Sequence, residues 1–378
     1  MTPADTERLT REYTPTEPRE GRLARALQVD VPVWRELGSE IFADLDDRSL
    51  GVRWWSPHPG TSRRILISDH LFTCVRSVET NLLEARLHLL EAMDFWERES
   101  EFHARAVSLS RDGRIELQLP ERERPLDEIP LAMATLHTVG FIRAIAGALD
   151  CFGASVVGVV ALRTSLLRAD LDTARRALAQ ITGGSAGERA QTRFHADLEA
   201  AIKRAGPEGW FRWVIDLRNT LIHRGRRLQM AELRPLPSGI LGLDGRPVIR
   251  THVIHQLPRD PGRSDVEMFL DAAHAPVLTE SAATTFLGVL KSTLQLIGEG
   301  GGLSLALWRA RRACPGLLLQ PRAQWPDGPS AATAGFAGYA PDSVPYNPTS
   351  LTSDAILIRR MTAASLGDAA RPAWANFD

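Results

Sequence analysis

Apolar residues recur at spacings of three and four over most of this chain, which is the pattern of amphipathic helices. The longest such stretch runs from Ser68 to about His103, and a second runs from Leu131 to about Arg168. Shorter helical patterns cover residues 171–181, 186–204, 210–230, 275–297 and 303–313. The pattern therefore predicts a mainly α protein whose helices form a bundle.

Glycine and proline mark the breaks between these helices. Gly183-Gly184-Ser185 ends one helical pattern, and Gly206-Pro207-Glu208-Gly209 precedes another that begins at Trp210. The glycine-rich segment 298–302 is expected to separate the last two helices. It lacks the Lys and Ser/Thr of a phosphate loop, so we expect a hinge there rather than an anion site.

Two short turn signals, Asp112-Gly113 and Asp244-Gly245, predict β-hairpins. The first would join strands within 106–119, and the second would join strands within 240–257. Residues 52–55 and 64–67 also have the composition of strands, with a turn at 58–60 between them. His252 and His255 are three residues apart, which in a strand places them on opposite faces and argues against a shared metal ion.

These patterns divide the chain into three parts. Residues 1–67 form a polar, extended N-terminal segment, and residues 68–315 form an α-helical domain with a β-hairpin insertion near 238–257. Residues 316–378 are rich in proline, glycine and alanine, and we expect an extended tail there.

Composition excludes several classes of protein. The chain has 378 residues and a net charge of −1, so no global basic field marks a dedicated nucleic-acid binder. Its three cysteines are widely separated, with no CxxC pair that would indicate a zinc site or a redox motif. The N-terminal residues lack the apolar core of a secretory signal. We therefore expect a cytoplasmic protein without metal or other cofactor.

One segment, Ala144 to Leu162, is almost wholly apolar. Asp150 interrupts it, and a carboxylate in the middle of a membrane is energetically costly. Several small residues along the segment also allow neighbouring helices to approach closely. We therefore expect the buried central helix of a bundle rather than a membrane span.

The best case for chemistry is the string Arg218-Asn219-Thr220-Leu221-Ile222-His223. Arginine holds a phosphate with a planar fork of donors, and histidine moves protons near neutral pH. Asn219 and His223 are four residues apart and share a helix face. An apolar stripe is expected to lie on the opposite side of the helix, formed by Trp210, Trp213, Val214, Leu217 and Leu221.

An arginine followed five or six residues later by a histidine also occurs elsewhere in the chain, for example at Arg98 and His103. Only the copy at 218–223 combines an asparagine directly after the arginine with an amphipathic helix and a basic flank. The flank consists of Arg224, Arg226 and Arg227. A solvated helix face is the simpler alternative, and the combination favours a functional site over it.

Asp216 to Arg224, with Arg218, Asn219 and His223 at its centre, resembles the signature of the HEPN superfamily, which is an Arg followed after four to six residues by a His. The resemblance implies a HEPN-like helical bundle and a metal-independent endoribonuclease that works as a homodimer in a prokaryotic antiviral defence or toxin–antitoxin system. It also implies a possible protein partner, such as an antitoxin or a defence-complex subunit. The alternative within the family is a non-catalytic scaffold or binding subunit. One toxin subfamily has Tyr two residues after the His, where this chain has Gly225.

On this hypothesis Arg218, Asn219 and His223 are catalytic and the substrate is RNA. Four arginines within the same helical pattern, 210–230, are candidate RNA-binding residues: Arg212, Arg224, Arg226 and Arg227. Asp150 and Asp216 are candidate supporting carboxylates, because a buried carboxylate needs a partner and can hold a catalytic side chain.

Overall fold

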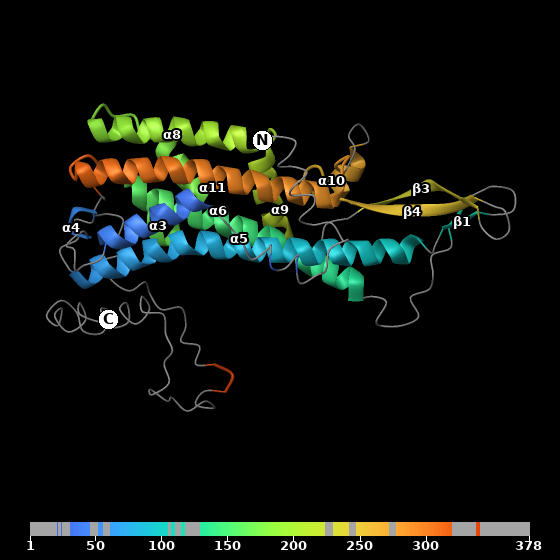
Figure 1. Cartoon of the computed structure of the whole chain (residues 1–378). Coiled ribbons are helices and arrows are strands. Elements are labelled where there is room, and N and C mark those ends of the chain that lie inside the picture. Colours follow the sequence, from blue (N-terminus) through green and yellow to red (C-terminus); the bar gives the residue numbers. More distant parts are fainter. Residues whose placement is uncertain are drawn as a thin grey trace. The chain divides into compact units, whose positions relative to one another are not determined.

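The computed structural model describes residues 31–45, 52–55, 61–104, 107–109, 115–117, 129–223, 230–241, 247–271, 277–319 and 338–340, together with Gly21 and Ala24. Over these residues the chain is mainly helical, which confirms the predicted fold class (Figure 1). Most of the expected C-terminal tail lies outside the described residues.

Long helices dominate the element order. The α-helices are α3 (Pro32–Leu45), α4 (Val52–Trp55), α5 (Thr61–Ala104), α6 (Ile129–Val160), α7 (Leu171–Ala179), α8 (Ala186–Ala205), α9 (Trp210–His223), α10 (Asp265–Leu270) and α11 (Ala282–Ala313). A 3₁₀ turn covers Leu166–Arg168. The strands are β1 (Val107–Leu109), β2 (Ile115–Leu117), β3 (Met230–Leu241) and β4 (Pro247–Gln256).

The N-terminal prediction is wrong for the described part of residues 1–67. Residues 52–55 are helical rather than a strand, and residues 64–67 lie inside α5, which begins at Thr61. Trp55 is fully buried and its Nε1 donates to the carbonyl of Gly158 at 3.0 Å. Packing of this kind overrides the local strand preference of aromatic and β-branched residues. The expected turn at 58–60 lies outside the described residues.

Both predicted hairpins are present as antiparallel pairs. In the first, Val107 pairs with Leu117 and Leu109 with Ile115. In the second, Met230 pairs with Gln256 at one end and Leu241 with Pro247 at the other. Its first strand starts at Met230, which is well before the expected insertion at 238–257 and corrects the expectation that the helix of the motif runs on to this residue.

The chain divides into two compact units. The first comprises residues 1–31, 79–148 and 200–297, and the second comprises residues 32–78, 149–199 and 298–378. Helices α5, α6, α8 and α11 each contribute residues to both units. The expected domain boundary between residues 67 and 68 falls inside α5.

The core of the first unit is built on aromatic rings. Phe286 of α11 stacks on Phe141 of α6 with ring centroids 4.6 Å apart, and it contacts Trp96 of α5 at 5.7 Å. All three side chains are buried. Because aromatic residues bury large areas, these contacts hold the three helices together.

In the second unit, glycines let aromatic rings approach a helix backbone. Trp34 of α3 and Phe152 of α6 meet edge to face, with ring centroids 5.4 Å apart. A Cβ atom built at Gly300 would lie 2.4 Å from the Phe152 ring, and one at Gly301 would lie 3.2 Å from Trp34. The expected helix break at 298–302 is therefore wrong. All of these glycines lie within the continuous helix α11, and the close approach of aromatic rings accounts for those at 300 and 301.

Side chains from three other helices satisfy the buried C-terminal carbonyls of α6. The fully buried Arg311 donates to the carbonyls of Gly158 and Val159, and Gln191 donates to that of Val160 at 2.8 Å. Trp55 adds its bond to Gly158. The last four carbonyls of a helix have no partner inside it, so these donors replace water at this end.

Arg311 is a cation in the protein interior. Burial lowers its pKa to about 9, so the guanidinium stays charged at neutral pH. Two indole rings, those of Trp54 and Trp308, lie within 5.7 Å of its central carbon. Helix-end carbonyls carry partial negative charge and indole faces attract cations, so these groups offset the loss of water.

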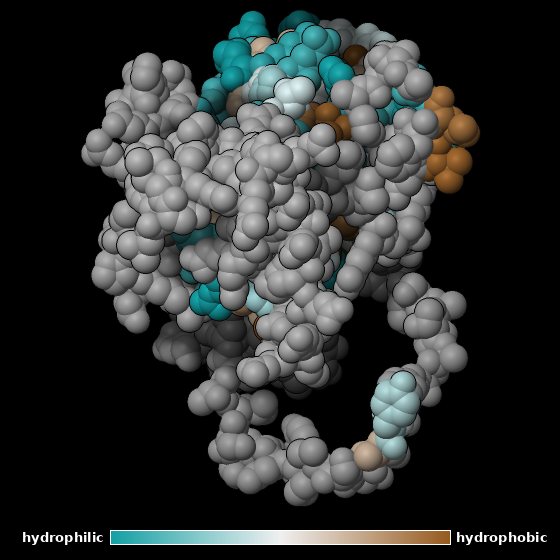
Figure 2. Space-filling view, turned by 90° about the vertical axis from the view of Figure 1, so that its right-hand side faces the viewer, coloured by the Kyte–Doolittle hydropathy of each residue, from teal (hydrophilic) through white to brown (hydrophobic). Residues whose placement is uncertain are grey.

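Helix α6 holds the segment Ala132–Val160, the one stretch of the described residues long and apolar enough to cross a membrane. Within its most apolar window 78% is buried inside the protein. This burial agrees with the expected central helix of a bundle. Elsewhere some apolar residues reach the surface, and Figure 2 shows patches of them in brown. Val266 and Leu270 of α10 are 69% and 79% exposed.

A pair of glycine substitutions tests the packing of α11. A Cβ atom at Gly298 would meet nothing within 4 Å, whereas one at Gly300 would overlap Phe152. We expect Gly298→Ala to raise the free energy of unfolding by about 0.5–1 kcal/mol, because alanine favours helix. Gly300→Ala should lower it by about 1–3 kcal/mol through overpacking. Equal effects of the two changes in urea unfolding would contradict this packing.

Candidate functional site

Helix α9 begins where the sequence predicts. Gly209 has φ of +82°, a conformation that favours glycine, and the Trp213 amide donates to its carbonyl at 2.9 Å. The Nε1 of Trp210 donates to the carbonyl of Ile202 at 3.0 Å and ties the start of α9 to α8. The helix ends at His223.

The buried side of α9 differs in part from the predicted stripe. Phe211 and Thr220 are buried there, while Trp213 and Leu221 are only half-buried. Trp210, Val214 and Leu217 are buried as expected. The buried stripe is thus rotated slightly from the expected one, because polar groups of Trp213 and Thr220 take part in contacts with another segment.

That segment is the chain that follows β4. The Trp213 Nε1 donates to the carbonyl of Pro258 at 3.0 Å, and the Thr220 hydroxyl donates to that of Pro261 at 2.6 Å. Between them on the helix, Asp216 lies beside Gly262, where a Cβ atom would be 3.6 Å from a carboxylate oxygen. One side of α9 is thereby bound to residues 258–262.

Asp216 also pairs with Arg212 on the same helix. The Arg212 Nε lies 2.8 Å from the Asp216 carboxylate, and the arginine side chain is 80% exposed. An exposed pair of this spacing contributes about 0.3–0.5 kcal/mol. The candidate RNA-binding residue Arg212 and the candidate supporting residue Asp216 are thus brought together, as an ion pair.

Of the three candidate catalytic residues, Arg218 and Asn219 have described side chains, and these differ in exposure. Asn219 is exposed, as predicted. Arg218 is half-buried, with its Nε in the interior. The reason is its place four residues after Val214 and seven after Phe211, both buried, which puts it at the border of the buried stripe.

Of the remaining candidate residues, the structure describes the side chain of Asp150. The His223 side chain and residues Arg224, Arg226 and Arg227 lie outside the described residues. Asp150 is half-buried on the part of α6 that belongs to the second unit. Burial raises the pKa of the adjacent Cys151 thiol, and the charge of Asp150 adds to that effect.

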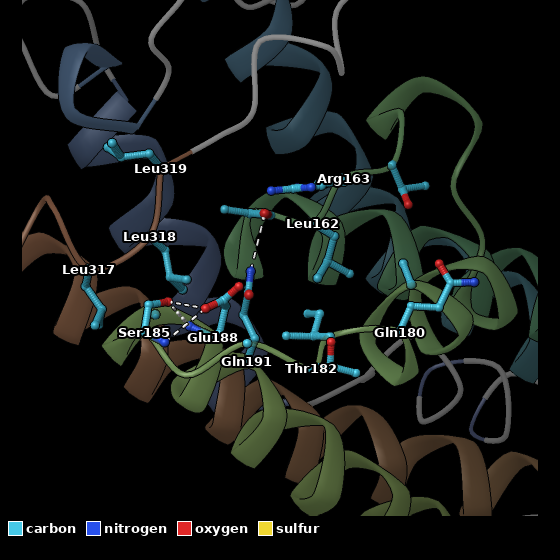
Figure 3. Close-up of a pocket in the computed structure, with 16 residues that line it drawn as sticks. Leu162, Arg163, Gln180, Thr182, Ser185, Glu188, Gln191, Leu317, Leu318 and Leu319 are labelled. Atoms are coloured by element: carbon cyan, nitrogen blue, oxygen red, sulfur yellow. Dashed lines mark hydrogen bonds between the residues drawn. The ribbon is translucent and has the colours of Figure 1, made fainter.

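The second unit contains a pocket of about 730 Å³ (Figure 3). Polar side chains that line this pocket form hydrogen bonds with backbone groups at the ends of helices. Ser185 and Glu188 bond to each other's backbone amides at the start of α8, at 2.9 and 3.2 Å. These hydrogen bonds hold the pKa of Glu188 below its ordinary value, with a smaller contribution from Arg163. The Gln191 side chain donates a hydrogen bond to the carbonyl of Val160 at the end of α6. The pocket therefore offers no better chemistry than the motif.

Sequence reasoning missed one titratable pair in the first unit. The Nδ1 atoms of His88 on α5 and His137 on α6 lie 3.0 Å apart, and Phe95 stacks on His137 at 5.8 Å. A Cβ atom at Gly140 would lie 2.5 Å from the His88 ring, so this ring sits against the backbone of α6. The two histidines are 49 residues apart, and no local pattern in the sequence links them.

The pair shares one hydrogen bond that requires a neutral ring. Burial lowers the pKa of His88, and the charge of Glu84 opposes this. Burial also lowers the pKa of His137, the charge of His88 adds to it, and Glu91 opposes it. Within the described ranges, no three or more His, Cys, Asp or Glu side chains gather so that they could hold a metal ion.

Comparisons with protein-family models, with curated proteins and with solved structures find no match.

The histidine pair predicts a pH dependence of stability. Both folded-state pKa values lie below the unfolded value near 6.5, so the unfolded chain binds more protons. The free energy of unfolding should therefore fall as pH drops through about 6.5 and stop changing from this source above it. We expect the double variant His88→Gln/His137→Gln to lose less stability than the wild type between about pH 7.5 and 5. Identical slopes in denaturant titrations would show that the pair is not responsible.

Proposed function

We propose that this chain is a metal-independent endoribonuclease with Arg218, Asn219 and His223 as its catalytic residues. The observation that carries the proposal is that one side of α9 is bound to a neighbouring segment while another side is accessible. Trp213, Asp216 and Thr220 face residues 258–262, whereas Asn219 is exposed and Arg218 is partly accessible beside it. His223 follows one helical turn after Asn219, where the helix ends.

These residue types suit the cleavage of RNA through its own 2′-hydroxyl. Neutral His223 takes the proton of the 2′-hydroxyl, whose oxygen attacks the adjacent phosphorus. The bond from phosphorus to the 5′-oxygen breaks, and that oxygen takes up a proton. Arg218 stabilises the extra negative charge of the phosphorane-like transition state, and Asn219 orients one of the two catalytic side chains. The products are a 2′,3′-cyclic phosphate and a 5′-hydroxyl end.

A single histidine is not both base and acid in one step. A second copy of the chain, with its motif facing the first, would supply the other histidine, and this favours a homodimer. The resemblance of residues 216–224 to the HEPN superfamily supports the same arrangement. It is also the basis for placing the protein in prokaryotic defence or a toxin–antitoxin system, in the cytoplasm, with a possible partner protein.

The second candidate is a non-catalytic binding or scaffold subunit. The half-burial of Arg218 favours this candidate, because a partly buried arginine is also suited to an interface contact. In that case the exposed Asn219 belongs to a binding surface, and the chain binds RNA or a protein partner without cleaving.

Cleavage assays with matched variants separate the two candidates. Purified wild type and His223→Ala, Arg218→Ala and His195→Ala proteins are incubated with transfer RNA and total RNA in excess chelator. We expect His223→Ala to lose roughly 100-fold or more of the cleavage rate, since general acid–base catalysis contributes at least that much. His195 lies on α8 in the second unit and is the control, so His195→Ala should cleave like wild type.

Unfolding midpoints measured on the same proteins show whether a loss of activity reflects a loss of folding. Cleavage by His223→Ala at the wild-type rate would refute the nuclease proposal. RNA binding without any cleavage by the wild type would favour the binding subunit.

A further inference from the structure

Both strands of the ribbon formed by β3 and β4 connect to helix α9 at the same end of the ribbon. β3 begins at Met230, seven residues after His223. β4 ends at Gln256 and leads into residues 258–261, whose carbonyls accept hydrogen bonds from Trp213 and Thr220. Figure 1 shows the two strands extending away from this part of the first unit. The ribbon is thus an arm whose two strands are both connected, at one end, to the helix that carries the motif.

The register of the two strands separates their residues into two sets. Arg234 pairs with His252, and Leu236 pairs with Arg250. Directly paired residues share a face of the ribbon, and alternate residues of a strand return to it. Positions 234, 250 and 252 therefore share one face, which we call the basic face. Glu232, paired with Ile254, is also on this face, nearer to α9.

The other face has a different composition. Its paired positions are Leu233 with Val253, Pro235 with Thr251, Pro237 with Ile249, and Ala231 with His255. The His255 ring stacks on the buried Trp96 of α5, with centroids 6.1 Å apart. At its base, this mainly apolar face therefore contacts α5. On the basic face, Gln256 at the base is also buried and donates to the carbonyl of Leu278 at 3.0 Å. Positions 234, 250 and 252 lie further along the ribbon from this contact.

Charge is concentrated in this part of the sequence. Residues 224–256 contain six arginines but only two carboxylates, Glu232 and Asp244, which amounts to a net charge of +4 with histidines neutral. The whole chain carries −1. A local excess of arginine in a nearly neutral chain is the electrostatic mark of a surface that binds a polyanion.

We propose that the basic face of the ribbon, at Arg234, Arg250 and His252, binds the phosphate backbone of a single-stranded RNA next to the motif on α9. This inference rests on the proposed function, because it is the nuclease reaction that makes RNA the polyanion of interest. Strand rise is about 3.4 Å per residue, so the eight paired residues from Met230 to Pro237 span about 24 Å. That length is sufficient to contact several successive phosphates.

The role of this face is to position the RNA, and cleavage itself remains with the motif. Arginine side chains that contact phosphates raise affinity without regard to base sequence. Each contact also releases counterions, so the affinity should depend on salt concentration. The ribbon would increase the residence of any single strand at the site and leave the chemical step unchanged.

The test measures binding without cleavage. All proteins carry His223→Ala, and the probe is a fluorescein-labelled, unstructured 20-nucleotide RNA followed by anisotropy. Arg234→Ala/Arg250→Ala is compared with Arg176→Ala/Arg193→Ala, which removes the same charge from exposed positions on α7 and α8 of the second unit. Unfolding midpoints confirm that each protein is folded, and Arg234→Lys/Arg250→Lys keeps the charge if the alanine variant does not fold.

We expect the ribbon variant to weaken binding about 10-fold or more, and its salt slope to fall by about 1.4, or about 0.7 per lost phosphate contact. The control pair should stay within about 2-fold, and the lysine variant should retain most of the affinity, because a phosphate accepts a point charge. Equal affinities of ribbon variant and control would overturn the proposal. So would polyglutamate that binds as tightly and with the same dependence on Arg234 and Arg250, because the partner would then be an acidic protein.

The outcome is separable from that of the proposed function. If the wild type cleaves RNA but the ribbon variant binds it normally, the ribbon proposal fails and the nuclease stands. If binding depends on Arg234 and Arg250 but the wild type cleaves nothing, the ribbon proposal stands and the nuclease fails.

Discussion

The hydrogen bond from the buried Thr220 hydroxyl to the carbonyl of Pro261, at 2.6 Å, sets the orientation of α9. Leaving either group unpaired in the interior would cost about 1–3 kcal/mol, so the helix is not free to turn about its axis. Trp213 adds a second bond of the same kind to Pro258. With this side of α9 bound to the chain after β4, Asn219 is left at the surface and Arg218 at the border of the core.

The same contacts connect the motif to the ribbon. β3 begins seven residues after the end of α9 at His223. The segment that follows β4 accepts hydrogen bonds from side chains of α9. A two-stranded ribbon is marginally stable by itself in water, so its attachment to packed helices matters. His255 on Trp96 supplies one such contact. The proposed catalytic and RNA-positioning groups thus share one support.

In the second unit the comparable constraint is the end of α6. An apolar helix that ends inside a protein exposes carbonyls to a medium without water, and Arg311, Gln191 and Trp55 replace that water. The cation is held by carbonyl dipoles and by indole rings. This arrangement explains how one of the most hydrophobic helices of the chain, with 78% burial in its most apolar window, ends within a folded unit.

Periodicity in the sequence was sufficient to predict the mainly α fold, the start of α9 at Trp210 and both hairpins, because these features depend on local spacing and turn chemistry. It failed where contacts with residues distant in the sequence determine the local structure. Gly300 looked like a helix break, but its neighbour Phe152, 148 positions earlier, requires a glycine inside a helix. Residues 52–55 have the composition of a strand, but they are helical, and Trp55 donates to the distant carbonyl of Gly158.

The candidate site shows the same division. The spacing of Asn219 and His223 and the exposure of Asn219 follow from helix geometry alone. The half-burial of Arg218 and the bonds of Trp213 and Thr220 depend on residues 258–262, whose position no local pattern reveals. The contact of His88 with His137 could not be predicted from the sequence either, since it joins two different helices.

The most direct measurement of the central claim is the chemistry of the cut RNA ends. A defined RNA is digested by the wild type in excess chelator, its fragments are analysed by mass spectrometry, and the digestion is repeated with a 2′-deoxy nucleotide at the cleaved position. The account predicts 2′,3′-cyclic phosphate and 5′-hydroxyl ends, and no cleavage of the deoxy substrate. Fragments with 3′-hydroxyl ends, or cleavage that continues without the 2′-hydroxyl, would contradict it.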